Sequence, residues 1–169
     1  MTDYQSSKDF IRQYYNALDA ADGDEITRVL LYHTTPGFVW RGMHPFNELS
    51  GAEELAERFW KPFCQAIGPI QRRPDLFLAG RSNGDNTKSE WVVSMGHLMG
   101  LFDQDWLGIP ASGKMVFLRY AEFHRIEKAL IDETVLFCDI LGVMLQVGLN
   151  PLPPQTGAFI LTPGPRTHD

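Results

Sequence analysis

Residues 114–140 read KMVFLRYAEFHRIEKALIDETVLFCDI, and this stretch decides the fold of the chain. Apolar and polar residues alternate with a period of two over 114–126 and again over 130–140, which is typical of β-strands. Lys128 and Ala129 lie between the two runs. We therefore predict a β-hairpin closed by a two-residue turn.

The turn also predicts the register of this hairpin. If Glu127 faces Leu130, paired residue numbers add up to about 257, and Glu122 lies opposite Val135. Side chains two residues apart project from the same face of a strand. The face that carries Glu122 is then expected to include Tyr120, His124, Glu133, Val135, Phe137 and Asp139.

Glu122 is an acidic residue on a largely apolar face. Removal from water raises the pKa of a carboxyl group and allows it to shuttle protons near neutral pH. His124 adds a second titrating group. The alternative is an ion pair between Glu122 and either Arg119 or Arg125, of which Arg119 would need a rotated strand. The sequence leaves both interpretations open.

The rest of the chain places helices before strands. Helical spacing of apolar residues predicts helices, and alternation predicts further strands. The predicted helices span 10–18, 24–30 and 52–67, and the additional strands span 37–42, 75–80 and 90–102. This order predicts an α+β fold with an antiparallel sheet covered on one face.

The domain organisation follows from length and proline content. A chain of 169 residues suits one domain, which we assign to residues 1–149. Residues 150–169 carry five prolines at 151, 153, 154, 163 and 165. Because proline cannot pair within a central strand, we expect these residues to form an extended arm.

Composition excludes several classes of function. A net charge of −6 argues against nucleic acid or an anionic membrane as the main partner. The polar N-terminus has no signal-peptide pattern, and no apolar run is long enough to span a bilayer. Cys64 and Cys138 lie in apolar stretches, which predicts buried free thiols and fits a reducing cytoplasm. The five histidines show no close pair at metal-ligand spacing, so no metal site is expected.

Residues 108–114 and 119–126, together with Glu133 and Asp139, resemble the SnoaL-like polyketide cyclases of the nuclear transport factor 2-like superfamily. The resemblance extends from Phe10 to Gly148. It implies a strongly curved antiparallel sheet, closed into a cone by three N-terminal helices, and a homodimer. It also implies an intramolecular aldol ring closure that needs no cofactor.

The resemblance assigns roles to two residues. Glu122 occupies the position of the family's acid/base carboxylate, which is usually Asp. His97 is the nearest match to the assisting histidine, although the surrounding pattern is shifted by one residue. The chain also lacks the family's aromatic residue after Glu133, and its loop 101–107 is longer than usual.

Four aromatic residues and one histidine are further candidates for substrate contact. Trp40 and His44 lie in a segment expected at the mouth of the cone. Trp106 lies on a loop, where exposed aromatic residues often contact ligands. Tyr120 and Phe137 share the predicted face of Glu122. For Trp40 and His44 the alternatives are a core tryptophan and a solvated loop histidine.

Three functions remain open. The first is a cofactor-free cyclase or isomerase acting on an apolar, oxygenated, polyketide-like small molecule. Glu122 would be its general acid/base, His97 or His124 would assist, and Asp139 would orient the substrate or act as a second carboxylate. The second is a non-catalytic binding module or dimeric scaffold. The third is a hydrolase or dehydratase using Glu122 and Asp139. A raised Glu122 pKa would favour the enzyme, and a lowered one the scaffold.

Overall fold

The computed structural model describes residues 4–86, 88–154 and 157. Three helical segments precede most of the sheet, as the apolar spacing predicts. Helix α1 spans Gln5–Ala20 and helix α2 spans Gly23–His33. The third segment is continuous from Gly51 to Ala66 and consists of α3 (Gly51–Leu55), the π-helical turn η1 (Ala56–Trp60) and α4 (Lys61–Ala66).

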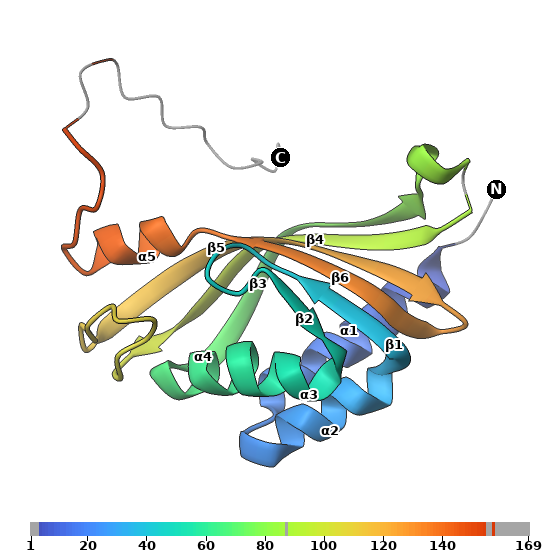
Figure 1. The fold of residues 1–169 in the computed structure, drawn as a ribbon, viewed down its shortest axis with the longest axis horizontal. Coiled ribbons are helices and arrows are strands. Elements are labelled where there is room, and N and C mark those ends of the chain that lie inside the picture. Colours follow the sequence, from blue (N-terminus) through green and yellow to red (C-terminus); the bar gives the residue numbers. More distant parts are fainter. Residues whose placement is uncertain (1–3, 87, 155–156, 158–169) are drawn as a thin grey trace.

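One six-stranded sheet forms the other layer. Its strands are β1 (Thr34–Arg41), β2 (Glu48–Ser50), β3 (Ile67–Arg81), β4 (Glu90–Phe102), β5 (Lys114–Glu127) and β6 (Leu130–Cys138). They follow the order β2-β1-β6-β5-β4-β3. Neighbouring strands are antiparallel except β1 and β6, which are parallel. Helices α1 to α4 cover one face of the curved sheet, here called the inner face (Figure 1). The predicted α+β fold with a curved sheet and three N-terminal helices is confirmed.

The hairpin of β5 and β6 has the predicted turn but not the predicted register. Lys128 and Ala129 both have positive φ angles, and Glu127 pairs with Leu130. The register then shifts, because Ile126 pairs with Ile131 whereas Arg125 pairs with Glu133. Asp132 is thus an extra residue on β6, a β-bulge that changes the face of every later side chain.

The bulge corrects the predicted face of Glu122. Glu122 pairs with Leu136, not with Val135. The inner-face partners on β6 are therefore Thr134, Leu136 and Cys138, all of which are buried. The predicted neighbours Glu133, Val135 and Phe137 lie on the opposite, outer face of the sheet.

An aromatic core fills the space between the helices and the inner face. Trp40 packs against Phe59, with ring centroids 5.2 Å apart, and Trp106 lies 5.2 Å from Phe63. Gly42 permits this packing, because a Cβ there would come within 2.1 Å of the Trp40 ring. Trp60 of the third helical segment is also buried.

A short helix follows the sheet where the sequence suggested a longer strand. Strand β6 ends at Cys138, and Asp139 caps helix α5 (Ile140–Gln146) by accepting a hydrogen bond of 2.8 Å from the Gly142 amide. The Gln146 side chain bonds both the amide and the carbonyl of Phe117, each at 2.8 Å. Helix α5 therefore takes the place of a strand beside the first half of β5.

The last residues of the chain are described only in part. Of the predicted arm 150–169, residues 155–156 and 158–169 lie outside the described residues, so the arm stays a prediction. In the part of the chain that the structure describes, no helix combines the length and apolar character needed to cross a membrane.

Candidate functional site

Strand β5 directs Glu122 and His124 into the interior. Inner-face residues of β5 alternate with outer-face ones, and Glu122 and His124 are only 1% and 0% exposed. Helix α1 packs over them with the buried rings of Tyr14 and Tyr15, which lie 5.6 and 5.5 Å from the His124 ring. A carboxylate and an imidazole are thus enclosed together beneath one helix.

A chain of hydrogen bonds joins these groups. The Tyr15 hydroxyl donates to Glu122 Oε2 at 2.9 Å and contacts His124 Nε2 at 2.9 Å. His124 Nδ1 contacts the Thr134 hydroxyl at 2.8 Å. The single hydroxyl proton of Tyr15 is donated to Glu122. The Tyr15 hydroxyl oxygen therefore accepts a hydrogen bond from His124 Nε2–H. His124 Nδ1 bonds the Thr134 hydroxyl in either protonation state, because that hydroxyl can donate or accept, so all four polar groups are satisfied.

Arg72 of β3 brings a buried positive charge to the same cluster. Its side chain is 4% exposed, and Nη1 donates to Glu122 Oε2 at 3.3 Å. Nε and Nη2 donate to the two carboxylate oxygens of Asp19, each at 3.0 Å. The guanidinium carbon lies 3.9 Å from the centre of the Tyr15 ring. We call Asp19, Arg72, Glu122, Tyr15 and His124 the buried cluster.

The surroundings set opposite pKa shifts on the two carboxyl groups. Burial by itself raises the pKa of Glu122. The charges of His124 and Arg72 and the hydrogen bonds from His124 and Tyr15 outweigh the effect of burial, and the pKa falls from 4.5 to about 2. Burial raises the pKa of Asp19 more than Arg72 lowers it. Burial and the Glu122 charge also raise the pKa of Tyr15 well above 10. At neutral pH, Glu122 is therefore a carboxylate and Tyr15 a neutral hydroxyl.

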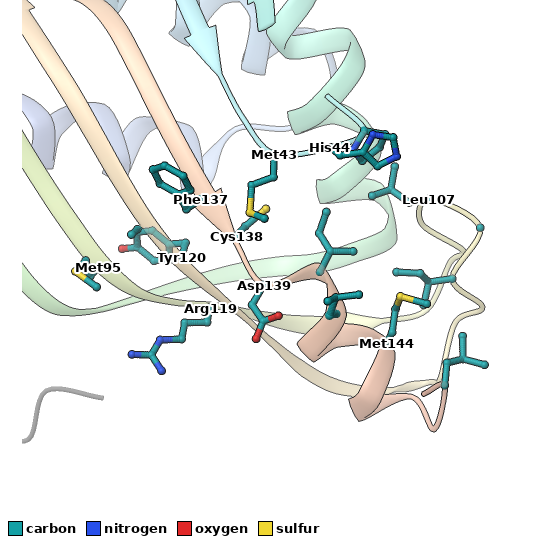
Figure 2. A pocket seen from close by; sticks show the side chains of 17 residues that line it. Met43, His44, Met95, Leu107, Arg119, Tyr120, Phe137, Cys138, Asp139 and Met144 are labelled. Atoms are coloured by element: carbon teal, nitrogen blue, oxygen red, sulfur yellow. The ribbon is translucent and has the colours of Figure 1, made fainter. Parts of the chain in front are cut away.

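A cavity of about 740 Å³ lies where β6 ends (Figure 2). The wall of this cavity includes outer-face residues and two inner-face residues, Tyr120 and Cys138. The cavity therefore extends around the end of β6. The remaining lining is largely apolar and comes from helix α5, the loop after β1 and the loop after β4. It includes Met43, Leu107, Ile109, Ile140 and Met144.

Tyr120 connects this cavity to the buried cluster. Its hydroxyl lies 2.8 Å from the Ser94 hydroxyl, and its ring centre lies 5.4 Å from the Arg72 guanidinium carbon. Tyr120 also precedes Glu122 by two residues on the same face of β5. Tyr120 thus lines the cavity and also approaches Arg72, whereas Glu122 is not among the described residues that line the cavity.

The structure brings together some of the predicted site residues and separates others. Glu122, His124 and Tyr120 share the inner face, whereas His44, Phe137 and Asp139 line the cavity. Asp139 is exposed and caps α5, so it does not join Glu122 as a second carboxylate. Phe137 and Asp139 therefore do not share one face with Glu122, as the predicted register required.

His97 is not positioned to assist Glu122. Ser94 of β4 pairs with Glu122 and lies on the inner face, so His97, three residues further along, lies on the outer face. Its Nδ1 lies 3.6 Å from a carboxylate oxygen of Asp75. The histidine in contact with Glu122 is His124.

Trp40 and Trp106 belong to the core rather than to an exposed ligand-contacting surface. Trp40 is 1% and Trp106 2% exposed. Backbone hydrogen bonds of 2.8 and 3.1 Å between Trp106 and Ile109 fold the loop back and carry the indole into the aromatic core. The expectation that Trp106 is an exposed loop aromatic is therefore wrong.

Sequence reasoning missed the strongest partners of Glu122. Neither Arg119 nor Arg125 pairs with it, because both project from the outer face, where Arg125 binds Asp132 and Glu133. Arg72 was not predicted to lie on a strand, because the predicted strand started at residue 75 whereas β3 begins at Ile67. Asp19 did offer a signal, since it lies four residues after Tyr15 at the edge of the buried stripe of its helix.

The described residues also bear on metal binding. Within 4–86, 88–154 and 157, no three His, Cys, Asp or Glu side chains lie close enough to hold a metal ion. Cys64 and Cys138 are free thiols, and burial raises their pKa values to about 11 and about 12. The chemistry that the site itself offers is proton transfer among carboxylate, hydroxyl and imidazole.

Comparison with known proteins identifies a family. Residues 11–134 match the family model described as the SnoaL-like domain. A protein from Jannaschia sp. CCS1, assigned as a SnoaL-like polyketide cyclase, is 24% identical over 87% of this chain and 94% of its own, with a TM-score of 0.66. No curated protein sequence matches the chain.

Two proteins of Streptomyces share the fold at lower identity. IdmH from Streptomyces antibioticus, assigned as a polyketide cyclase, is 16% identical over 86% of this chain and 99% of its own, with a TM-score of 0.67. AclR from Streptomyces galilaeus, assigned as a hydroxylase, is 14% identical over 90% and 91%, with a TM-score of 0.70. These similarities show the shared fold, which hosts more than one assigned activity.

Proposed function

Because the chain belongs to the SnoaL-like domain family, whose fold supports cyclase-type functions on small molecules, we propose that it is a cofactor-free proton-transfer catalyst, a cyclase or isomerase. The observation that carries the proposal is the hydrogen-bonded series Glu122–Tyr15–His124, with steps of 2.9 Å between buried side chains. Its free thiols suit a reducing cytoplasm.

In the proposed reaction Glu122 acts first. Its carboxylate takes a proton from a carbon next to a substrate carbonyl, and the electron pair of the broken C–H bond moves to the carbonyl oxygen to form an enolate. A carboxylate with a pKa near 2 is a weak base. His124 holds the Tyr15 hydroxyl through the contact of 2.9 Å, and Tyr15 in turn holds the carboxyl group that has taken the proton. In an aldol cyclisation the enolate carbon bonds to a second carbonyl carbon of the substrate, and Glu122 returns its proton to the alkoxide oxygen that forms. In an isomerisation Glu122 returns the proton to a different carbon of the enolate system.

The cavity at the end of β6 is the proposed substrate site. A volume of about 740 Å³ and a largely apolar wall suit a molecule of one to three fused rings. His44, Tyr120 and Phe137 line its wall. This arrangement favours an apolar substrate with its reactive oxygen directed toward Tyr120.

Deuterium exchange tests the proposed base directly. The probe is 2-tetralone, a bicyclic ketone, in D₂O, and loss of its α-proton NMR signal is measured against buffer alone. The wild-type protein should accelerate exchange, and Glu122→Gln should lose at least about a hundredfold of that acceleration. Glu133→Gln, on the outer face of the same hairpin, is the control and should retain it. Full exchange activity in Glu122→Gln would refute the role of Glu122.

A second candidate function is ligand binding without chemistry. It is favoured by the lowered pKa of Glu122 and by the mutual satisfaction of the charged groups in the buried cluster. It predicts that 2-tetralone binds with a saturable heat signal in calorimetry while its exchange rate equals that of buffer. Hydrolysis or dehydration by two carboxylates has less support, because Asp139 caps α5.

We also propose that the protein is a homodimer formed through the outer face of the sheet. A second groove there, of about 480 Å³, is lined by apolar residues of β3 to β6. Leu78 and Phe137 in this groove are 45% and 53% exposed. Apolar side chains of this size are usually buried against a partner when they gather on one face.

A further inference from the structure

Arg72 lies between two carboxylates and is held more tightly by one of them. Asp19 receives two hydrogen bonds of 3.0 Å from the guanidinium, whereas Glu122 receives one of 3.3 Å. A two-point contact of this kind is stronger and more directional than a single one. The guanidinium carbon also lies 3.9 Å from the centre of the Tyr15 ring. Arg72 is thus oriented chiefly by Asp19.

The charges of these three groups do not cancel. Asp19 and Glu122 contribute two negative charges, and Arg72 contributes one positive charge. If Arg72 faced Glu122 alone, the buried pair would be neutral, and adding a proton to Glu122 would leave an unpaired buried cation, which is very costly. With Asp19 present, protonation of Glu122 leaves the neutral Asp19–Arg72 pair behind.

We propose that Asp19 is a positioning residue that takes up the charge of Arg72 and thereby leaves Glu122 able to accept a proton. This inference rests on the proposed function, in which Glu122 is the base. Asp19 does not touch the substrate in this scheme and acts only through Arg72. Its side chain, 19% exposed against 1% for Glu122, lies at the edge of the buried cluster.

Other titratable groups face the cluster and are kept constant in the test. Tyr14 and Tyr15 approach from α1, Tyr120 and His124 from β5, and Cys138 from β6. Burial raises the pKa values of the three tyrosines and of Cys138, so these groups stay neutral over the pH range of interest.

The first measurement is the exchange of 2-tetralone α-protons. Asp19→Asn keeps the shape of the side chain but removes its charge, and we expect the exchange rate to fall by about tenfold, as for a loss of about one pKa unit in the base. Asp19→Glu restores the charge and should recover part of the rate. Asp9→Asn, at an exposed position of the same helix, is the matched control and should change nothing. An unchanged rate in Asp19→Asn would overturn the proposal.

The second measurement needs no substrate. Carbon-13 NMR follows the Glu122 carboxyl group, with Glu122→Gln identifying its signal. Arg72→Met should raise the Glu122 pKa. Asp19→Asn alone should lower it, because Arg72 then acts on Glu122 alone, and the same substitution added to Arg72→Met should change it far less, because Asp19 acts through Arg72. Arg73→Met, the exposed neighbour on the same strand, should leave the signal unchanged. A Glu122 pKa that is the same in the wild type and in Asp19→Asn, or that falls equally with and without Arg72, would overturn the proposal.

The two measurements distinguish failure of the role proposed for Asp19 from failure of the proposed proton-transfer function. If the wild-type protein does not accelerate exchange, the proposed function fails, and the order of the Glu122 pKa values still decides whether Asp19 acts on Glu122 through charge. If exchange occurs and the pKa values do not differ, the assignment of Asp19 alone fails.

Discussion

Glu122→Gln should remove a part of the stability that depends on pH. The substitution replaces a buried carboxylate with a neutral amide of the same shape. The Glu122 pKa falls from 4.5 to about 2 on folding, a difference of about 2.5, and each unit corresponds to about 1.4 kcal/mol. The ionised carboxylate thus contributes about 3 kcal/mol to the free energy of unfolding at neutral pH.

The sign of this contribution fixes its pH range. Because the pKa of Glu122 is lower in the folded state, the folded protein binds fewer protons. The contribution is complete above the unfolded-state pKa of 4.5 and disappears as the pH falls toward about 2. The raised pKa of Asp19 acts in the opposite direction. Asp19 is present in both the wild type and Glu122→Gln, so the difference in stability between these two proteins reports chiefly on Glu122.

Urea unfolding followed by circular dichroism measures the effect. At pH 7 the variant should be less stable than the wild type by about 3 kcal/mol, and the two stabilities should converge as the pH approaches 3. Glu133→Gln is the control for the loss of a carboxylate on the same hairpin. A difference that stays constant from pH 7 to pH 3 would refute the reasoning. Greater stability of Glu122→Gln at pH 7 would show that the desolvation of Glu122 outweighs its partners.

Three further outcomes follow from the placement of single side chains. His124→Gln should slow 2-tetralone exchange by about a hundredfold, because His124 belongs to the buried cluster. His97→Ala should leave the rate unchanged, because His97 lies on the outer face. Equal rates in the two variants would contradict this. Trp106→Ala should lower the free energy of unfolding by about 3–5 kcal/mol in urea titrations, as is usual for a buried aromatic residue, and a loss below about 1 kcal/mol would place the indole outside the core. Leu78→Glu should shift the proposed dimer to monomer in sedimentation velocity, and a wild-type protein that sediments as a monomer would refute the interface.

Much of the fold could be predicted from local patterns. Alternation of apolar residues locates β4, β5 and β6 almost to the residue, and the spacing of apolar residues in α1 to α4 locates the helical layer. These patterns are reliable because each reflects the burial of one face of one element. The order of helices and strands then leads to the α+β class.

Local patterns did not predict where this regularity is interrupted. A single extra residue, Asp132, shifts the partner of Glu122 from Val135 to Leu136. Alternation within β6 looks the same with or without the bulge, since the strand continues on both sides. The helix after Cys138 was missed for a related reason, because its capping by Asp139 depends on where β6 stops.

The sequence by itself determined that residues 114–138 form a hairpin and that Glu122 projects from a mostly apolar face, because both depend on residues a few positions apart. The tertiary structure alone decided what surrounds Glu122. Tyr15 reaches it across 107 positions and Arg72 across 50, from α1 and β3, and these long-range contacts leave no periodic signal. A carboxylate that burial alone would make hard to ionise is instead held ionised by charges and hydrogen-bond donors that only the folded chain brings together.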